Sequence, residues 1–229
     1  MEFANGGNLQ NYLKHNFRDL TWSDKKKLAF QIADGLNYLH NEDVLHRDLH
    51  SKNIVIHENN AKITDFGISK VENNSTICNG TFGKVAYMEP QILVNPKFQY
   101  IKPSDIYSYG VLMWEISSGY PPFRDNERFY ISNAIINEIR EDAVPDTPAD
   151  YEKLYKKCWS QKPEQRPTIL EILEVFSKMG FRMSIKESAE QIVMTNNSDT
   201  ESQTDNENSD NILFVLYCGK DKWQGKIND

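Results

Sequence analysis

Residues 46–53 read His-Arg-Asp-Leu-His-Ser-Lys-Asn, and twelve positions after Asn53 residues 65–67 read Asp-Phe-Gly. The first stretch holds an acid, Asp48, that can accept a proton from a hydroxyl group, with cationic side chains on both sides of it. The amide of Asn53 and the carboxylate of Asp65 offer the hard oxygen ligands that Mg²⁺ prefers. Together these groups could move a phosphoryl group from a nucleotide onto a hydroxyl, a reaction catalysed mainly by positioning and charge stabilisation.

A small β-hairpin is predicted between the two acids. Residues 53–57 and 61–64 are short, partly β-branched runs that flank the turn sequence Glu-Asn-Asn. Asp48 precedes this hairpin and Asp65 follows it, so its folding would bring both carboxylates to one edge.

Helices dominate the rest of the prediction. The sequence Thr-Trp-Ser-Asp at residues 21–24 can cap a helix start, and an apolar stripe of helical spacing then runs to about His40, just before the 46–53 stretch. Residues 105–117 are apolar on nearly every face, which predicts a buried helix that ends at Gly119. Further helical patterns cover residues 129–140, 149–159 and 168–179.

The composition indicates one globular domain followed by an acidic tail. The chain has 229 residues, 39% of them hydrophobic and 26% charged. We place the domain at residues 1–180 and a largely disordered tail at residues 181–229, because residues 195–211 are almost wholly Asn, Ser, Thr, Asp, Glu and Gln. Within this tail, residues 212–217 are apolar and resemble a short strand or a docking motif.

Charge and hydropathy restrict the partners. The net charge of -7 argues against nucleic acid and anionic membranes as partners. The N-terminus shows no signal peptide, and no apolar run is long enough to span a bilayer. We therefore expect a soluble, cytoplasmic protein without membrane contact.

The order and spacing of these motifs resemble the catalytic domain of the eukaryotic protein kinases, and the resemblance extends over residues 1–179. It implies a protein-kinase-like α+β fold, of which this chain supplies the mainly α-helical large lobe with a small β-hairpin and not the N-terminal lobe. His50, followed by Lys52, makes the catalytic loop similar to that of the tyrosine-kinase-like group.

The resemblance implies a role for each chemical group. Asp48 would be the catalytic base, and Lys52 would offset the negative charge that develops on the transferred phosphoryl group. Arg47 would pair with a phosphate on the activation loop and so order that loop. Asn53 and Asp65 would bind Mg²⁺ next to ATP.

Other positions would form the nucleotide pocket and the regulatory loop. Residues 1–8 resemble the hinge between lobes, in which Glu2 and Ala4 would meet the adenine through backbone groups and Asn8 would lie near the ribose. The activation loop would hold the candidate phosphorylation sites Ser69, Ser75, Thr76 and Thr81.

Two further residues would support the site. Asp105 would hydrogen-bond the backbone of the catalytic loop, and Arg166 would brace the end of the activation segment. Residues 89–91 read Glu-Pro-Gln where the family has Ala-Pro-Glu, so the expected partner of Arg166 is the neutral amide of Gln91. We expect a looser brace, with partial compensation by Glu89 left open.

Two departures concern the substrate hydroxyl. His50 stands where serine/threonine kinases usually place lysine, with Lys52 two positions further on, and Lys84 stands where they keep threonine. The resemblance therefore leaves Ser/Thr and Tyr hydroxyls both open.

Only forty-five residues precede His46, and they contain no Gly-rich phosphate loop, no ATP-binding strand lysine and no helix glutamate to pair with it. We expect an incomplete protein kinase chain that transfers the γ-phosphoryl group of ATP to a protein substrate with the help of Mg²⁺. Residues 1–229 alone would bind ATP negligibly. The alternative is a catalytically inactive kinase-lobe module that acts as a binding or scaffold protein. The exposed lobe interface would offer a surface to a partner.

Overall fold

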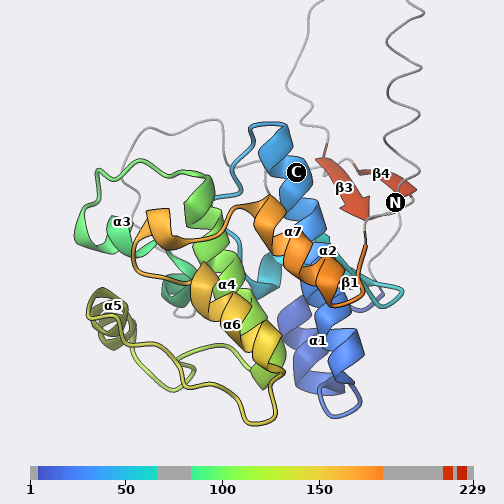
Figure 1. Ribbon diagram of the computed structural model, residues 1–229, viewed down its shortest axis with the longest axis horizontal. Helices are drawn as coiled ribbons and strands as arrows, with labels where there is room; N and C mark the ends of the chain where they lie inside the picture. The colour runs from blue at the N-terminus through green and yellow to red at the C-terminus, as the bar shows by residue number, and fades with distance from the viewer. Residues whose placement is uncertain (1–4, 66–83, 183–213, 219–220, 226–229) are drawn as a thin grey trace, which may run out of the picture.

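The computed structural model describes residues 5–65, 84–182, 214–218 and 221–225. Two long helices, α2 (Trp22–Asn41) and α4 (Lys102–Ser118), pack against each other at its centre. Helix α7 (Ile169–Lys178) lies along α2, and α6 (Ala149–Cys158) lies along α4 (Figure 1). The chain is mainly helical, as the sequence predicts.

Helix α2 begins at the capping residues that the sequence indicates. The backbone N–H of Asp24 donates to Oγ1 of Thr21 at 3.2 Å, and the backbone N–H of Thr21 donates to Oδ2 of Asp24 at 2.9 Å. This reciprocal capping box satisfies backbone donors that the first helical turn leaves free. The apolar stripe then faces the core, where Ile32, Ala33 and Leu36 are fully buried.

Helix α4 forms the centre of the core. Every residue from position 104 to 118 is buried, which confirms the prediction of a helix without a solvent-facing side. The helix ends at Gly119, whose φ of 82° lies in the left-handed region and whose N–H donates to the carbonyl of Glu115 at 2.8 Å. A Cβ atom there would lie 2.5 Å from the ring of Phe17, so the position requires glycine for space as well.

The predicted hairpin consists of β1 (Ile54–His57) and β2 (Asn60–Ile63), which pair antiparallel with Ile54 opposite Ile63. Helix α2 holds it through Gln31, whose Oε1 accepts from the backbone N–H of Ala61 at 2.9 Å. Helix α1 (Leu9–Asn16), which the sequence analysis did not predict, lies against β1.

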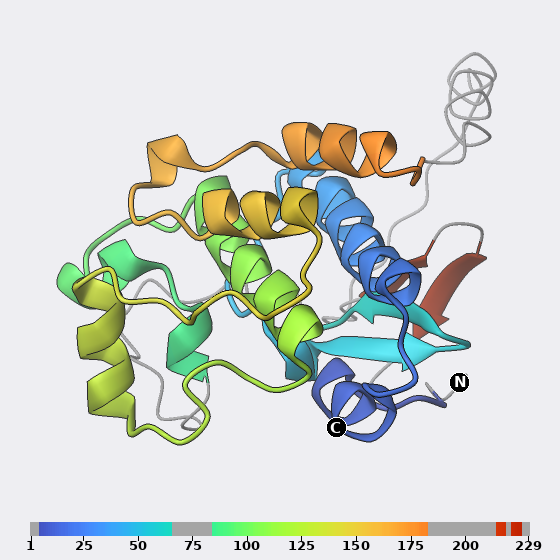
Figure 2. The same ribbon diagram turned by 60° about the horizontal axis from the view of Figure 1, so that its bottom comes forward.

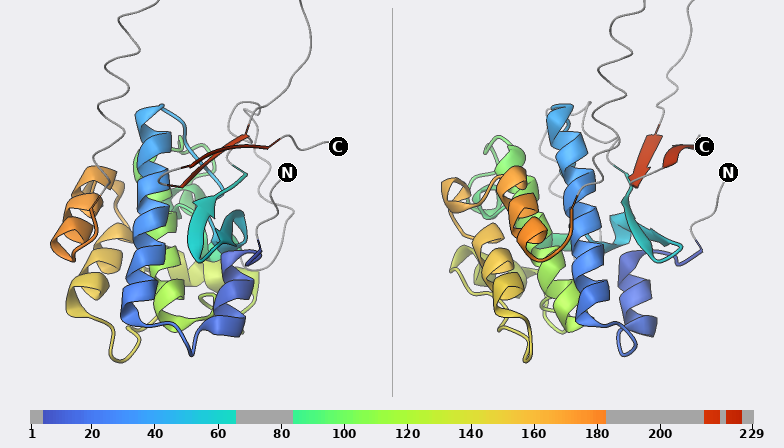
Figure 3. Two further views of the ribbon diagram at one scale, coloured as in Figure 1. Left: turned by 90° about the vertical axis from the view of Figure 1, so that its right-hand side faces the viewer. Right: turned by 45° about the vertical axis from the view of Figure 1, so that its right-hand side comes forward.

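A second hairpin lies beside the first. Strands β3 (Phe214–Cys218) and β4 (Asp221–Gly225) pair antiparallel, and β3 lies next to β2 (Figures 2 and 3). The strand predicted at residues 212–217 is thus present, while β4 was not predicted. The tail segment 195–211, predicted to be disordered, lies outside the described residues.

The remaining elements connect the core to the site. They are η1 (Ser51–Asn53), η3 (Lys84–Tyr87), α3 (Pro90–Val94), α5 (Arg128–Ile136) and η4 (Pro163–Gln165). None of the helices in the described part of the chain is long and apolar enough to cross a membrane.

Candidate functional site

The buried carboxylate of Asp105, near the start of α4, organises the loop that contains Asp48. Its two oxygens accept hydrogen bonds from the backbone N–H groups of His46 and Arg47, each at 3.0 Å. The hydroxyl of Tyr100 also donates to Oδ1 at 2.8 Å, and Nε2 of His40 lies 3.0 Å from Oδ2. Burial acts to raise the pKa of Asp105, but these hydrogen bonds favour the charged form and leave the pKa lowered. The predicted anchor of the catalytic loop is confirmed.

Two residues of the site have a left-handed backbone although neither is glycine. Arg47 has a φ of 67° and Asp65 a φ of 59°. Such conformations persist where surrounding contacts hold them, and the bond from Arg47 to Asp105 is one such contact. The Arg47 side chain is exposed, and its predicted phosphate partners, Ser69, Ser75, Thr76 and Thr81, lie outside the described residues.

His46 joins the two acid-bearing loops. Its Nδ1 accepts from the backbone N–H of Asp48 at 3.3 Å, and its Nε2 lies 3.0 Å from the carbonyl of Thr64. Burial lowers the pKa of His46, and a neutral ring with its proton on Nε2 satisfies both contacts. The backbone N–H of Thr64 also donates to the carbonyl of Asn53 at 2.9 Å. The hairpin therefore brings the neighbours of both acids to one edge, and the meeting of the two carboxylates there remains a prediction.

Three side-chain nitrogen atoms lie close to one oxygen of the Asp48 carboxylate. Its Oδ2 lies 2.8 Å from Nζ of Lys84, 3.3 Å from Nδ2 of Asn53 and 3.5 Å from Nε2 of His50. Burial acts to raise the pKa of Asp48, but His50 and Lys84 outweigh it and lower the pKa to about 2. At neutral pH the group is ionised, as a proton acceptor must be.

The oxygen atoms predicted to bind Mg²⁺ suit that ion chemically. Asn53 uses its Nδ2 to donate to the backbone carbonyl of Asp48 at 2.9 Å, so the amide is oriented without use of its Oδ1. The carboxylate of Asp65 is exposed and has no ion-pair partner within the described residues. That part of the chain contains no group of three or more His, Cys, Asp or Glu side chains arranged to hold a metal ion. Mg²⁺ commonly takes one or two protein ligands and completes its shell with water and phosphate oxygens, so the pair fits.

The other predicted site residues do not all contact Asp48. Lys52 is exposed in η1, and its backbone N–H donates to Nδ1 of His50 at 3.1 Å. Asn8 caps α1, since its Oδ1 accepts a 2.9 Å hydrogen bond from the first turn; its contact with a ribose remains a prediction. Glu2 and Ala4 lie outside the described residues.

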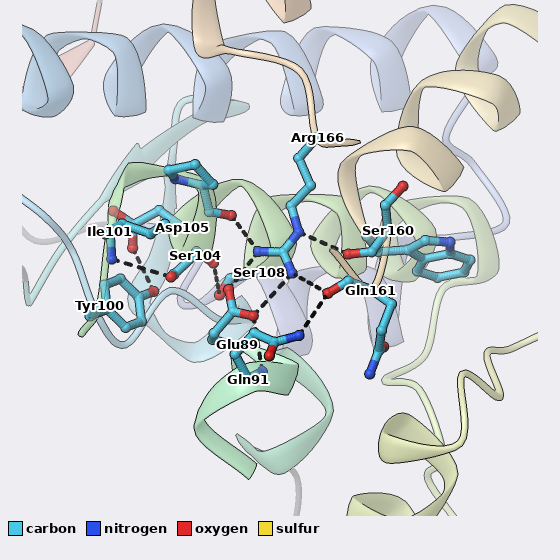
Figure 4. A network of polar contacts seen from close by, with 12 residues as sticks. Glu89, Gln91, Tyr100, Ile101, Ser104, Asp105, Ser108, Ser160, Gln161 and Arg166 are labelled. Atoms are coloured by element: carbon cyan, nitrogen blue, oxygen red, sulfur yellow. Dashed lines mark hydrogen bonds and ion pairs between the residues drawn. The ribbon is translucent and has the colours of Figure 1, made fainter. Parts of the chain in front are cut away.

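The brace around Arg166 differs from the prediction. Its guanidinium forms a two-pronged ion pair with Glu89, in which Nη2 donates to Oε1 at 3.0 Å and Nη1 donates to Oε2 (Figure 4). Both side chains are fully buried. Gln91 instead donates to the backbone of the segment after α6, at 3.4 Å. The expectation of a looser brace is therefore wrong, because Glu89 at the N-cap of α3 faces Arg166 directly and keeps both charge-assisted bonds.

Arg166 ties three segments together. It donates to the carbonyls of Ser160 at 2.8 Å, Pro103 at 2.8 Å and Gln161 at 3.1 Å, and its guanidinium carbon lies 5.1 Å from the centre of the Tyr107 ring. The start of α3, the start of α4 and the link between α6 and α7 are thus fixed relative to each other. This holds η3 and α3 next to the loop of Asp48.

Comparison with known proteins agrees with this geometry. The model of the protein tyrosine and serine/threonine kinase family matches residues 1–176, and the chain belongs to this family. A Dictyostelium discoideum protein described as a probable serine/threonine-protein kinase is 33% identical over 180 residues, which cover 78% of this chain and 19% of the relative. A mitogen-activated protein kinase kinase kinase of Drosophila melanogaster is 34% identical over 190 residues, which cover 76% of this chain and 16% of the relative.

A third relative, the RGS domain-containing serine/threonine-protein kinase A of Dictyostelium discoideum, is 31% identical over 173 residues, or 75% of this chain and 15% of its own. The chain therefore spans less than a fifth of the length of each of these three relatives. The fold is that of a kinase domain in part: a mainly helical lobe with a two-stranded antiparallel sheet beside the site.

Sequence reasoning missed the contact of Lys84 with Asp48 and left open whether Glu89 would compensate for Gln91 at Arg166. In both cases the available signal was a charged residue at a position where the family has an uncharged one. The partners lie 36 and 77 positions apart, so the sequence alone did not reveal which groups would meet.

Proposed function

We propose that this protein is a kinase that transfers the γ-phosphoryl group of ATP to a serine or threonine hydroxyl of a protein substrate, with residues 1–229 supplying the large lobe of its catalytic domain. The observation that carries the proposal is the state of Asp48. It is an ionised carboxylate, 30% exposed, on a loop fixed by the buried Asp105, and the contacts described above use its Oδ2 and leave Oδ1 for a hydroxyl.

In the proposed reaction, the substrate hydroxyl oxygen forms a bond to the γ-phosphorus while the bond from that phosphorus to the bridging oxygen of ADP breaks. ADP leaves with the electron pair of the broken bond, and Asp48 accepts the hydroxyl proton. Mg²⁺, held by Asn53 and Asp65, would neutralise charge on the phosphate oxygens. Lys52, exposed near the same loop, would approach the transferred group from the solvent side.

The choice of serine and threonine over tyrosine rests on the relatives. All three that are described above carry serine/threonine-protein kinase or mitogen-activated protein kinase kinase kinase in their names. The protein substrate itself and any partner at the lobe interface are not specified by these names.

The substitution Asp48→Asn tests the mechanism. In the longest open reading frame that contains residues 1–229, we expect it to lower phosphate incorporation into a generic protein substrate at least about 100-fold, the usual contribution of a positioned base. Asp43→Asn is the matched control, because Asp43 is exposed, has a φ of 53° that asparagine tolerates, and among the described residues its side chain makes only a surface ion pair, with Lys102. Activity that survives in Asp48→Asn would contradict the mechanism, whereas phosphotyrosine as the sole product would contradict only the hydroxyl class.

Nucleotide binding separates the kinase from the scaffold alternative. For residues 1–229 alone we expect no shift of the unfolding temperature with Mg·ATP, and clear stabilisation would contradict that expectation. A folded, full reading frame that shows neither ATP binding nor transfer would instead favour the inactive kinase-lobe module.

A further inference from the structure

The catalytic loop does not contain a cation that contacts the base. His50 stands where serine/threonine kinases usually place lysine, but its Nδ1 accepts a hydrogen bond from the backbone N–H of Lys52 at 3.1 Å. A ring that accepts at Nδ1 carries its only proton on Nε2 and has no charge. His50 is buried and packs near the ring of Tyr87, with the ring centres 6.2 Å apart. Its role in this arrangement is to cap η1.

Lys84 brings a cation to the base from a different part of the chain. Its Nζ lies 2.8 Å from Oδ2 of Asp48, and both side chains are 30% exposed. The segment that carries Lys84 is firmly attached to the core. Tyr87, at the end of η3, donates from its hydroxyl to Oε2 of Glu115 at 2.6 Å, and its carbonyl accepts from the hydroxyl of Ser108 at 2.7 Å. Helix α4 therefore positions both η3, through these bonds, and the Asp48 loop, through Asp105.

We propose that Lys84 is the positioning residue of the catalytic base: its ammonium group holds Oδ2 of Asp48, so that Oδ1 faces the substrate hydroxyl, at a shorter distance than the His50 ring, which lies 3.5 Å from the same oxygen. This inference rests on the proposed function. Asn53 and His50 also lie near this oxygen, at 3.3 Å and 3.5 Å, so groups from two segments surround it.

Two other assignments account for the geometry less well. Lys52 is exposed, and within the described residues its side chain forms no ion pair with Asp48. A blocking role for Lys84, in which it must leave before Asp48 can act, would require the ammonium to occupy the oxygen that accepts the proton. The contacts gather on Oδ2 instead, and none of those described involves Oδ1.

The kinetic test compares Lys84→Met, Lys84→Arg and Lys102→Met in the full reading frame. Lys102 is the control because its Nζ also pairs with an aspartate, Asp43, at 2.7 Å, but on the exposed surface. We expect Lys84→Met to lower kcat about 10- to 100-fold, the effect of a misplaced catalytic group, with the KM for ATP changed less than about threefold. Lys84→Arg should recover most of kcat, and Lys102→Met should match the wild type. Unchanged or increased kcat in Lys84→Met would overturn the inference, as would an arginine variant no better than methionine.

A second measurement does not depend on kinase activity. In residues 1–229, the unfolding equilibrium constants of Asp48→Ala, Lys84→Met and the double variant form a cycle. If the two side chains form an ion pair, the change in the unfolding equilibrium constant of the double variant should differ from the product of the two single changes. The expected difference is about two- to fivefold, the range for a partly exposed ion pair. Independent effects would show that the two groups do not interact, and would overturn the inference. Failure of the wild type to transfer phosphate, with the coupling intact, would instead contradict the proposed function.

Discussion

Replacement of Glu89 by alanine tests the brace between the activation segment and the helical core. In the wild type, the Glu89 carboxylate pairs with both terminal nitrogens of Arg166 in a fully buried position. It also accepts a hydrogen bond from the backbone N–H of Gln91 at 3.0 Å, which caps α3. The alanine variant would leave a buried guanidinium without its counter-ion and α3 without its cap.

The structure allows the size of the loss to be worked out. Removal of one partner of a buried ion pair costs about 3–5 kcal/mol. Arg166 would keep its hydrogen bonds to three backbone carbonyls and its contact with the ring of Tyr107, so the lower end, about 3 kcal/mol, applies. Loss of the cap adds about 1 kcal/mol. We therefore expect Glu89→Ala to lower the free energy of unfolding by about 4 kcal/mol.

Urea unfolding of residues 1–229, followed by fluorescence of the buried Trp114 and Trp159, measures this difference. Glu152→Gln is the control, because it removes an exposed i,i+4 pair with Lys156 and should cost less than about 0.5 kcal/mol. A double variant, Glu89→Ala with Gln91→Glu, restores the Ala-Pro-Glu order of the family and should recover part of the loss. A Glu89→Ala variant within about 1 kcal/mol of the wild type would refute the assignment of a tight brace.

Two more predictions concern helix α4. A Cβ atom at Gly110 would lie 2.8 Å from Cβ of Cys158, so Gly110→Ala should lower the free energy of unfolding by about 1–3 kcal/mol. Thermal unfolding measures this loss against the control Gly35→Ala, where the atom nearest to a new Cβ, at 3.2 Å, is the end of a flexible side chain. Equal stability of the two variants would contradict the prediction. Burial raises the pKa of Glu115 from 4.5 to about 7, despite the hydrogen bond from Tyr87. The folded state therefore binds the proton more tightly than the unfolded state, and this group's contribution to stability is complete below pH 4.5 and lost as the pH rises through about 7. In the wild type the free energy of unfolding should therefore decline by about 3 kcal/mol between pH 4.5 and about 7, and Glu115→Gln should remove this decline. The variant should show a flatter curve of unfolding temperature against pH, and an unchanged curve would count against a buried Glu115 with a raised pKa.

The local elements were largely predictable. The capping sequence at residue 21 and the apolar stripe after it define α2, and the uniform apolar character of residues 105–117 corresponds to the fully buried α4. The short runs around residues 58–60 correspond to β1 and β2. In each case the signal lies within about one element, since capping and hydrophobic spacing act over a few residues.

Short elements were harder to predict. Helix α1, with eight residues, and α3, with five, carry too few turns for a periodic pattern to be distinct. Their positions follow from packing: Leu9 and Leu13 of α1 are fully buried, and α3 is set by the side chain of Glu89.

The sequence by itself predicted the chemistry that we propose for this protein. The types and spacing of Asp48, Asn53 and Asp65, on either side of a short hairpin, predict a phosphoryl-transfer site, because a local hairpin can bring such groups to one edge.

Only the tertiary structure decided how the acidic and basic groups pair. Glu89, and not Gln91, meets Arg166, and Lys84, and not the nearby Lys52, meets Asp48. The physical reason is that these pairs join segments far apart in the chain, which meet only because the buried helix α4 holds η3, the Asp48 loop and the segment of Arg166 in fixed places. A charge selects its partner by distance and burial, and both are properties of the folded chain.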